Sequence, residues 1–393
     1  MSRKFILYTP TLNYCGGVEA SAGQLIRLLD RVVIQTHVLT ETEISTFQFI
    51  NNYYEKRSEF FVNYGVYPMR LLKHIGKDRR DRICRSSQGS SLASIIAPFV
   101  LVIRLILLKM AIHRVKPSLL IMQVPNIYSL ILLLFFKNLP RMAWVHTTFT
   151  LRRGGLFWIL NKLVLALGSK GDKKLMICSN SDIGKEHAGK LFPGLRIEVL
   201  YPPYDDRFFY PRFDLKELGR ILVVARIAKH KRIEKSLEAA SLLKHRHRCS
   251  FKLRIIGDIE DPDYHTYLER RILELHLEDR VSIIPNPTLL AIRSEYWSSW
   301  VCWNFSEGTY GRVNVEAMAC GCVVLATPNM IDVVGPEFVC KNIEEFANKT
   351  AELIRNPNLC LVGRNLAFAS KQKYSETSFD PRALELLSQI VWF

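Results

Sequence analysis

Residues 306–321, Ser-Glu-Gly-Thr-Tyr-Gly-Arg-Val-Asn-Val-Glu-Ala-Met-Ala-Cys-Gly, join a glycine-rich loop to a helical pattern. The apolar run at 301–303 precedes this stretch and is typical of a buried strand. We therefore expect a strand that ends near Asn304, a loop, and a helix that begins near Gly311 or Arg312. A strand, a tight loop and a helix in this order form the repeating unit of a parallel α/β sheet.

The start of this predicted helix has the chemistry of an anion site. Free backbone N–H groups of a first helical turn can hold a phosphate, and here they belong to Gly311, Arg312, Val313 and Asn314. Glu316, about one turn into the helix, is placed to accept hydrogen bonds from a ribose diol, and Glu307 can hold sugar hydroxyls. The alternative is structural, with Glu307 as a helix cap and Glu316 as a solvated residue, but apolar residues follow Glu316.

Strand-like runs alternate with segments of helical length on both sides of this stretch, as in doubly wound parallel sheets. The earlier runs lie at 5–8, 32–39, 119–122, 142–145, 175–178 and 197–200. The later runs lie at 221–225, 253–256, 281–284, 301–303 and 323–326. The sequence therefore predicts an α/β protein with two similar domains.

The pattern breaks at Tyr201-Pro-Pro-Tyr-Asp-Asp-Arg, which we interpret as a hinge. We place the first Rossmann-like domain at 1–203 and the second at 204–375. Residues 376–393 are expected to form a terminal helix, amphipathic over 381–393, that packs back on the first domain.

Glycines and cations follow the first predicted strand of each domain. Ligands of open parallel sheets bind at the carboxyl ends of the strands. Arg226 and Lys231 follow the run at 221–225, where cations can neutralise the charge on a leaving diphosphate. Gly16 and Gly17 follow the run at 5–8 and allow a backbone to approach a ligand closely. The structural alternatives are a solvated basic loop and a plain tight turn.

Together these motifs resemble the GT-B glycosyltransferases of family 4. The resemblance is carried by Glu-Gly…Gly…Glu-Ala-Met-Ala-Cys-Gly, by Gly-Gly-Val-Glu near the start, and by an Arg-x4-Lys pair between them. It covers nearly the whole chain, densely over 219–330 and thinly over 41–135. It implies two Rossmann-like domains that face each other across a cleft, the first on the acceptor side and the second binding a nucleotide sugar.

The resemblance also implies roles for single residues. It places Gly16 and Gly17 under the donor phosphates, His146 beside the transferred sugar, Arg226 and Lys231 on the diphosphate, Glu316 on the ribose, and Gly257 at a turn near the base. Without it, His146 would be interpreted as a core residue at a strand end. One departure concerns Glu307, which eight residues separate from Glu316 where the family has seven. Either the loop is longer by one residue, or Gly308 occupies the usual position of the glutamate.

The implied activity is retaining transfer of a hexose, mannose from GDP-mannose, to a hydroxyl of a glycan or lipid-linked acceptor. The Tyr-Pro-Pro hinge and Trp303-Asn304 resemble the mannosyltransferases that extend lipid-linked oligosaccharides. The resemblance implies no metal and no cofactor, with the donor diphosphate accepting the proton of the acceptor. The alternatives are a transferase that uses a UDP-sugar and a catalytically inactive basic homologue that binds membranes.

The charge of the chain points to a polyanionic partner. Lys and Arg number 54 and Asp and Glu 37, a net charge of +17, which attracts nucleic acid, phosphate-bearing substrates or an anionic membrane. A binding module for nucleic acid, or aromatic residues interleaved with a basic stripe, is not evident, so nucleic acid is disfavoured. Nine scattered cysteines favour a reducing compartment.

An apolar stretch at 92–110 has about the length of a membrane span. Pro98 and Arg104 interrupt it, which favours a buried or interfacial helix over a spanning one. Seven Lys and Arg residues at 70–85 lie just upstream, a combination that suits an anchor on anionic lipid, although a solvated loop is the alternative. We expect a cytoplasmic protein held at the cytoplasmic face of a membrane.

Overall fold

The computed structural model describes residues 4–9, 17–40, 105–106, 108–124, 133–146, 172–356 and 358–391. The chain divides into two compact units. The N-terminal unit comprises Met1–Asn180, Gly184–Leu200 and Arg382–Phe393, and the C-terminal unit comprises Ser181–Ile183 and Tyr201–Pro381. The main divisions between the units lie at 200/201 and 381/382. The sequence predicted boundaries at 203/204 and 375/376.

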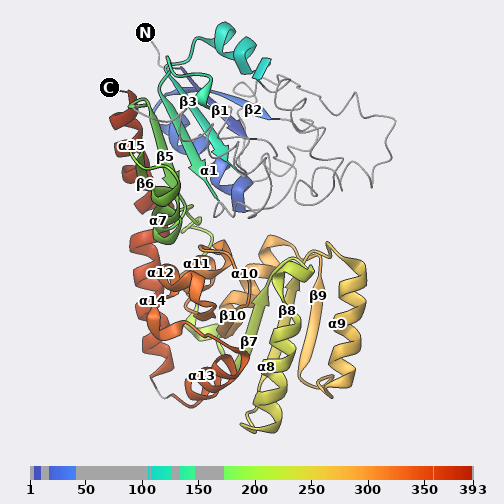
Figure 1. The fold of residues 1–393 in the computed structure, drawn as a ribbon. Helices are drawn as coiled ribbons and strands as arrows, with labels where there is room; N and C mark the ends of the chain where they lie inside the picture. The colour runs from blue at the N-terminus through green and yellow to red at the C-terminus, as the bar shows by residue number, and fades with distance from the viewer. Residues whose placement is uncertain are drawn as a thin grey trace. The chain divides into compact units, whose positions relative to one another are not determined.

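The N-terminal unit contains a six-stranded parallel sheet in the order β2-β1-β3-β4-β5-β6 (Figure 1). Its strands are β1 Lys4–Thr9, β2 Gln35–Thr40, β3 Leu119–Val124, β4 Arg141–Val145, β5 Leu175–Ser179 and β6 Arg196–Val199. Helix α1, Gly17–Arg31, follows β1, and helix α7, Asp182–Leu191, follows β5. Strands β4 and β5 are buried along their whole length, as expected for central strands that are covered on both faces.

The C-terminal unit contains a five-stranded parallel sheet in the order β11-β10-β7-β8-β9. Its strands are β7 Glu217–Val224, β8 Lys252–Gly257, β9 Val281–Pro285, β10 Ser299–Asn304 and β11 Val323–Ala326. Its helices are α8 Glu234–His245, α9 Pro262–Glu274, α10 Leu289–Ser298, α11 Arg312–Ala319, α12 Ile331–Val334, α13 Ile343–Arg355 and α14 Leu359–Tyr374. Helix α15, Glu376–Val391, runs across the division between the units.

Each face of the C-terminal sheet has its own core, because successive side chains of a strand point to opposite faces. Ile221 and Val223 of β7 pack with residues of α8, α9 and α13. Leu222 and Val224 pack on the other face with residues of α10, α11 and α12. Burying a side chain of this size stabilises the fold by roughly 1.5–3 kcal/mol, so both helical layers are held mainly by apolar contact.

One strand differs from the sequence expectation in where it begins. Strand β2 begins at Gln35 rather than at residue 32, because Val33 has φ +59 and its N–H donates to Asp30 O, which closes the end of α1. Helix α15 begins at Glu376, the first residue of the expected terminal helix, and Pro381 lies inside it. The other predicted strands match observed strands to within four residues.

Several predicted features lie outside the described residues: Gly16, the basic stretch at 70–85, and most of the apolar stretch at 92–110. Of that apolar stretch, residues 105–106 and 108–110 are helical. Across the described ranges, no helix has the length and apolar character that a membrane crossing requires.

Candidate functional site

The candidate site lies at the carboxyl end of the C-terminal sheet, where β7, β8 and β10 end side by side (Figure 1). Strands β7 and β10 are direct neighbours, with Ile221 opposite Val301 and Leu222 opposite Cys302. The loops that follow them therefore leave the sheet at adjacent positions. We name residues 225–232, after β7, the cation loop, and residues 305–311, after β10, the glycine loop.

Close contact between β7 and β8 fixes the cation loop at its base. A Cβ atom on Gly257, the last residue of β8, would lie 1.8 Å from Ala225 O, so no other residue fits without a backbone shift. Ile227 N–H donates to Asp258 O at 2.8 Å, which extends the pairing beyond the strands. The structure thus gives the predicted glycine turn at Gly257 a packing role.

Two ion pairs connect the cation loop to its neighbours. Arg226 Nη1 pairs with Glu260 Oε2, from the segment after β8. Arg232 Nη2 lies 2.5 Å from Glu307 Oε1, in the glycine loop. The Arg226 and Glu307 side chains remain more than half exposed, at 51% and 61%. The Arg232–Glu307 contact joins the two loops directly.

Lys231 is the more enclosed of the two lysines in the cation loop. It lies in the 3-10 turn η5, Lys229–Lys231, and is partly buried, whereas Lys229 is exposed. Burial lowers the pKa of Lys231 below its usual value, the charge of Arg226 lowers it further, and Glu260 opposes both. A cation held in this way gains from the arrival of an anion, because the anion offsets both the burial and the repulsion.

The glycine loop is shaped by two asparagines. Asn304 Oδ1 accepts hydrogen bonds from Ser306 N at 3.1 Å and Ser306 Oγ at 2.6 Å, and Asn304 Nδ2 donates to Asn314 Oδ1 at 2.8 Å. Gly311 has φ +62 and a Cβ there would lie 2.7 Å from Asn314 Nδ2, so the position favours glycine. Helix α11 begins at Arg312, as predicted, and Gly311 is its N-cap without a capping side chain.

Glu316 is buried on α11, which rules out the solvated alternative for this residue. Its Oε1 accepts a hydrogen bond from Arg312 Nε at 2.7 Å, and its Oε2 lies 3.4 Å from Tyr296 OH. Burial raises the pKa of the Glu316 carboxyl, and the Arg312 charge opposes that rise. A ligand hydroxyl that bonds to Glu316 must therefore share the carboxylate with Arg312 and Tyr296.

Tyr310 fixes the last turn of the glycine loop. Its hydroxyl donates to Pro202 O in the Tyr-Pro-Pro segment, and its own carbonyl accepts from Asn314 Nδ2 at 3.3 Å. Its ring is buried and stacks on that of Tyr201, with 6.2 Å between centroids. The predicted hinge segment thus contacts the glycine loop within the C-terminal unit.

Three predicted site residues belong to the N-terminal unit. His146 follows β4, and its Nε2 is buried without a hydrogen-bond partner among the described residues. Burial lowers the pKa of His146 to about 3, so its imidazole is neutral near pH 7. Gly17 is the first residue of α1, and Gly16 lies outside the described residues.

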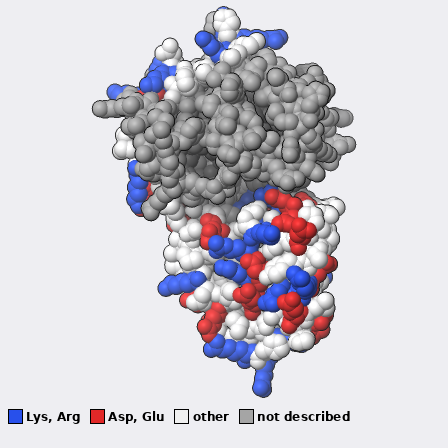
Figure 2. All heavy atoms as spheres, turned by 45° about the vertical axis from the view of Figure 1, so that its right-hand side comes forward, with Lys and Arg blue, Asp and Glu red and all other residues white. Residues whose placement is uncertain are grey.

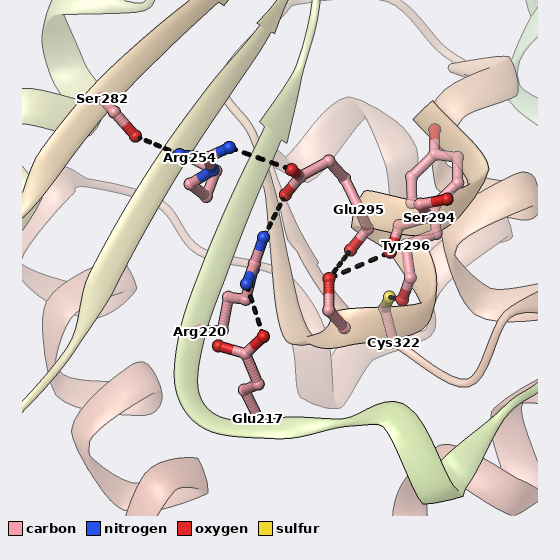
Figure 3. A network of polar contacts seen from close by, with 9 residues as sticks. Glu217, Arg220, Arg254, Ser282, Ser294, Glu295, Tyr296 and Cys322 are labelled. Atoms are coloured by element: carbon pink, nitrogen blue, oxygen red, sulfur yellow. Dashed lines mark hydrogen bonds and ion pairs between the residues drawn. The ribbon is translucent and has the colours of Figure 1, made fainter. Parts of the chain in front are cut away.

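The opposite, amino-terminal end of the same sheet also carries arginines, but in a closed network (Figure 3). Glu295 of α10 pairs with Arg220 of β7 at 2.8 Å and with Arg254 of β8 at 3.1 Å. Arg254 Nη1 also donates to Ser282 Oγ of β9 at 2.9 Å, and Arg220 Nη1 lies 2.6 Å from Glu217 Oε1. These contacts hold α10 to β7 and β8, and Arg254 links β8 to β9.

Sequence reasoning missed Glu260, Tyr296 and Tyr310. Each acts through a partner that lies far away in the chain, such as Arg226 for Glu260 and Pro202 for Tyr310. A signal for Glu260 was its place just beyond the strand run at 253–256, where side chains of a parallel sheet reach the ligand end. The sequence also contains an Asp-x-Asp pattern at Asp261 and Asp263, and Asp261 caps α9 by accepting from Tyr264 N at 3.1 Å.

Residues 212–366 match a protein-family model described as glycosyl transferases group 1. The match covers the candidate site of the C-terminal unit, from the cation loop to α14. No curated protein matches the chain significantly.

Solved structures similar to this one extend over both units. A glycosyltransferase from Rickettsia africae is 15% identical, with a TM-score of 0.75 and 99% of each chain covered. Sucrose-phosphate synthase from Thermosynechococcus elongatus gives the same identity, TM-score and coverage. HepE of Anabaena in complex with UDP and glucose is 16% identical, with a TM-score of 0.69 and 98% of this chain and 99% of that chain covered.

The two parallel-sheet units and these similarities confirm the predicted GT-B fold, with two Rossmann-like domains. The domain match and the fold together support a glycosyltransferase.

Proposed function

We propose that this chain is a retaining glycosyltransferase that moves a hexose from a nucleotide-diphosphate sugar to a hydroxyl of a glycan or lipid-linked acceptor. One observation carries the proposal: the cation loop and the glycine loop leave neighbouring strands and meet through Arg232 and Glu307. This contact brings the cations after β7 to the loop that leads into the first turn of α11, and both can bind a diphosphate.

In this proposal the protein stabilises the leaving diphosphate by charge. Arg226 and Lys231 offset the negative charge that develops on the leaving phosphate, and the N–H groups of Arg312 and Val313 hold its oxygens. The N–H of Asn314, which the sequence also predicted as a phosphate donor, instead donates to Gly311 O at 2.8 Å. Glu316 accepts hydrogen bonds from the ribose. The leaving phosphate takes the proton of the acceptor hydroxyl on the face from which it departs, so no carboxylate forms a covalent intermediate.

Roles in sugar binding are proposed for three further residues. Glu307 is exposed at the tip of the glycine loop and can reach hydroxyls of the donor sugar. His146, with its neutral imidazole, is proposed to lie beside the transferred sugar. Gly17 begins α1, where free N–H groups favour an anion, which supports its proposed place near the donor phosphates.

The proposed donor is GDP-mannose, on the resemblance of the hinge and of Trp303-Asn304 to lipid-linked oligosaccharide mannosyltransferases. A UDP-hexose is the second candidate, because a structure of the same fold, HepE, was solved with UDP and glucose. We propose that neither donor needs a metal ion, since Arg226 and Lys231 supply the positive charge.

A panel of sugar nucleotides tests this proposal. Purified protein is incubated with GDP-mannose, UDP-glucose and UDP-N-acetylglucosamine, with and without polyprenyl-linked glycan acceptors, and with EDTA in parallel. We expect turnover with one of these donors, retention of the anomeric configuration, and no effect of EDTA. Glu316→Gln should reduce turnover by more than tenfold, whereas Glu352→Gln, on the exposed surface of α13, should not.

Failure of every donor to turn over or to stabilise the protein against heat would contradict the enzyme proposal. Binding of nucleotides without turnover would favour the inactive homologue. Loss of activity in EDTA that Mg²⁺ restores would contradict metal independence alone.

We also propose that the N-terminal unit binds an anionic membrane surface. The C-terminal unit has 25 Lys and Arg against 25 Asp and Glu, so the net charge of +17 belongs to the N-terminal unit, with 29 against 12. On the face of the C-terminal unit seen in Figure 2, basic and acidic side chains are accordingly intermixed.

Binding of the protein to vesicles that contain phosphatidylserine should decline as salt is raised to about 0.5 M. Equal binding to neutral phosphatidylcholine vesicles would contradict the proposal that the N-terminal unit binds an anionic membrane.

A further inference from the structure

Glu260 faces the cation loop from the end of the neighbouring strand. Its carboxylate pairs with Arg226 Nη1, and it is the more enclosed partner, with 24% of its side chain exposed. Half of the Arg226 side chain stays exposed. A guanidinium held through one edge by a fixed carboxylate keeps its other N–H groups available for an anion.

The backbone around Glu260 is fixed on both sides. Glu260 N donates to Ile227 O at 3.2 Å and Asp261 N donates to the same carbonyl at 3.0 Å, so the segment is tied to the cation loop itself. Asp261 then caps α9 by accepting from Tyr264 N. The carboxylate therefore has a defined position relative to Arg226, which neighbours Ile227 in the chain.

The charge of Glu260 is also needed locally. The cation loop contains Arg226, Lys229, Lys231 and Arg232 within seven residues. Among these, Arg226 and Lys231 repel each other, because the Arg226 charge lowers the pKa of Lys231 while Glu260 opposes that effect. A carboxylate beside them limits the repulsion before a donor arrives.

We propose that Glu260 is a positioning residue for donor binding, which holds the Arg226 guanidinium in the orientation that receives the donor diphosphate. The inference rests on the proposed function and adds a residue to it. Glu260 acts through Arg226 and does not touch the donor phosphates itself, because two negative groups in contact would weaken binding.

The test measures binding of UDP and of GDP to the full chain by calorimetry, together with KM and kcat for the preferred sugar donor. Glu260→Gln keeps the size of the side chain and removes its charge. We expect the Kd of the preferred nucleotide and the KM of the donor to rise about fivefold, with kcat within about twofold. Glu260→Asp, which keeps the charge on a shorter side chain, should recover part of the affinity.

A matched control is Glu274→Gln, which breaks the pair with Arg271 on α9, 2.6 Å long and outside the site. It should leave Kd, KM and kcat unchanged. A double-mutant comparison separates positioning from a general structural effect, because Glu260→Gln should cause no further loss of affinity once Arg226→Ala is present.

Three results would overturn the inference while leaving the proposed function in place. The first is an unchanged Kd of the nucleotide in Glu260→Gln. The second is a lower Kd in that variant, which would show that Glu260 competes with the phosphates. The third is a further loss of nucleotide affinity when Glu260→Gln is added to Arg226→Ala. Wild-type protein that binds neither UDP nor GDP would instead overturn the proposed function, and this inference with it.

Discussion

The two ends of the C-terminal sheet use the same residue types in different surroundings. At the amino end, Glu295 is shared by Arg220 and Arg254, and its side chain is only 12% exposed. At the carboxyl end, Arg226 and Arg232 each have a glutamate of their own, and these glutamate side chains are more exposed, at 24% for Glu260 and 61% for Glu307. The ion pairs at the amino end connect a helix to two strands, whereas those at the carboxyl end connect loops that follow the strands.

The difference shows how one interaction serves two purposes. A shared, enclosed carboxylate leaves its arginines little freedom, and its loss leaves charges buried without a counter-charge. A half-exposed pair contributes little to stability, since solvent screens it, and its arginine remains open to a ligand. Enclosure of the glutamate partner, and not residue type, therefore separates the arginines that stabilise the fold from those available to a donor.

The largest expected effect is on activity at the carboxyl end. Lys231→Ala should lower kcat/KM by about a hundredfold, because it removes a cation from the leaving diphosphate. Its free energy of unfolding should change by less than about 0.5 kcal/mol, since burial already disfavours the charged amine. Steady-state kinetics and denaturant unfolding measure the two quantities.

The matched control is Lys229→Ala, in the same 3-10 turn but exposed. It should keep kcat/KM within about twofold of the wild type. Equal losses in the two variants would mean that net charge, and not the place of Lys231, supports activity.

The next effect is on stability at the amino end. Glu295→Gln should lower the free energy of unfolding by about 2 kcal/mol, because Arg220 and Arg254 lose the carboxylate between them. Donor KM should not change, since the network lies at the opposite end of the strands. Urea denaturation and donor titration test both statements.

Glu217 offers a control inside the same network, because it pairs with Arg220 from an exposed position. Glu217→Gln should lower the free energy of unfolding by less than about 0.5 kcal/mol. If Glu295→Gln lowers the free energy of unfolding no more than Glu217→Gln does, enclosure of the carboxylate does not distinguish the two ends of the sheet.

The smallest expected effect is a pH dependence of nucleotide binding. An amine with a lowered pKa loses its proton at a lower pH than an ordinary lysine, so affinity should fall as the pH rises toward the usual lysine value of 10.5. We expect a loss of a few-fold between about pH 7 and about pH 10 in the wild type. Calorimetric titrations of the preferred nucleoside diphosphate across this range measure it.

Lys231→Arg should abolish this loss, because a guanidinium stays protonated throughout. Lys229→Arg serves as the control and should retain it. The same fall in Lys231→Arg as in the wild type would assign the pH dependence to another group.

Much of the fold was predictable because apolar runs of strand length alternate with helical patterns and are punctuated by glycine and proline. The predicted end of β10 near Asn304 and the start of α11 at Arg312 are both confirmed. The start of β2 was wrong by three residues, because valine has a strong strand propensity and the left-handed turn at Val33 is decided by the end of α1.

The candidate site was predictable only in part. Residue types at strand ends identified Arg226, Lys231 and Glu316, since position in a parallel sheet determines which end faces a ligand. Sequence spacing did not show that Glu316 is buried against Arg312 and Tyr296. The assigned roles of these residues stay predictions until donor binding is measured.

The sequence by itself determined the order of the elements and the loops that carry glycines and cations, because these depend on local patterns of a few residues. Only the tertiary structure decided the partner of each charge. Glu260 reaches Arg226 across 34 residues, and Glu295 reaches Arg220 across 75. Such partners are set by which strands lie side by side and by how much solvent the packing leaves, and neither property is local in the chain.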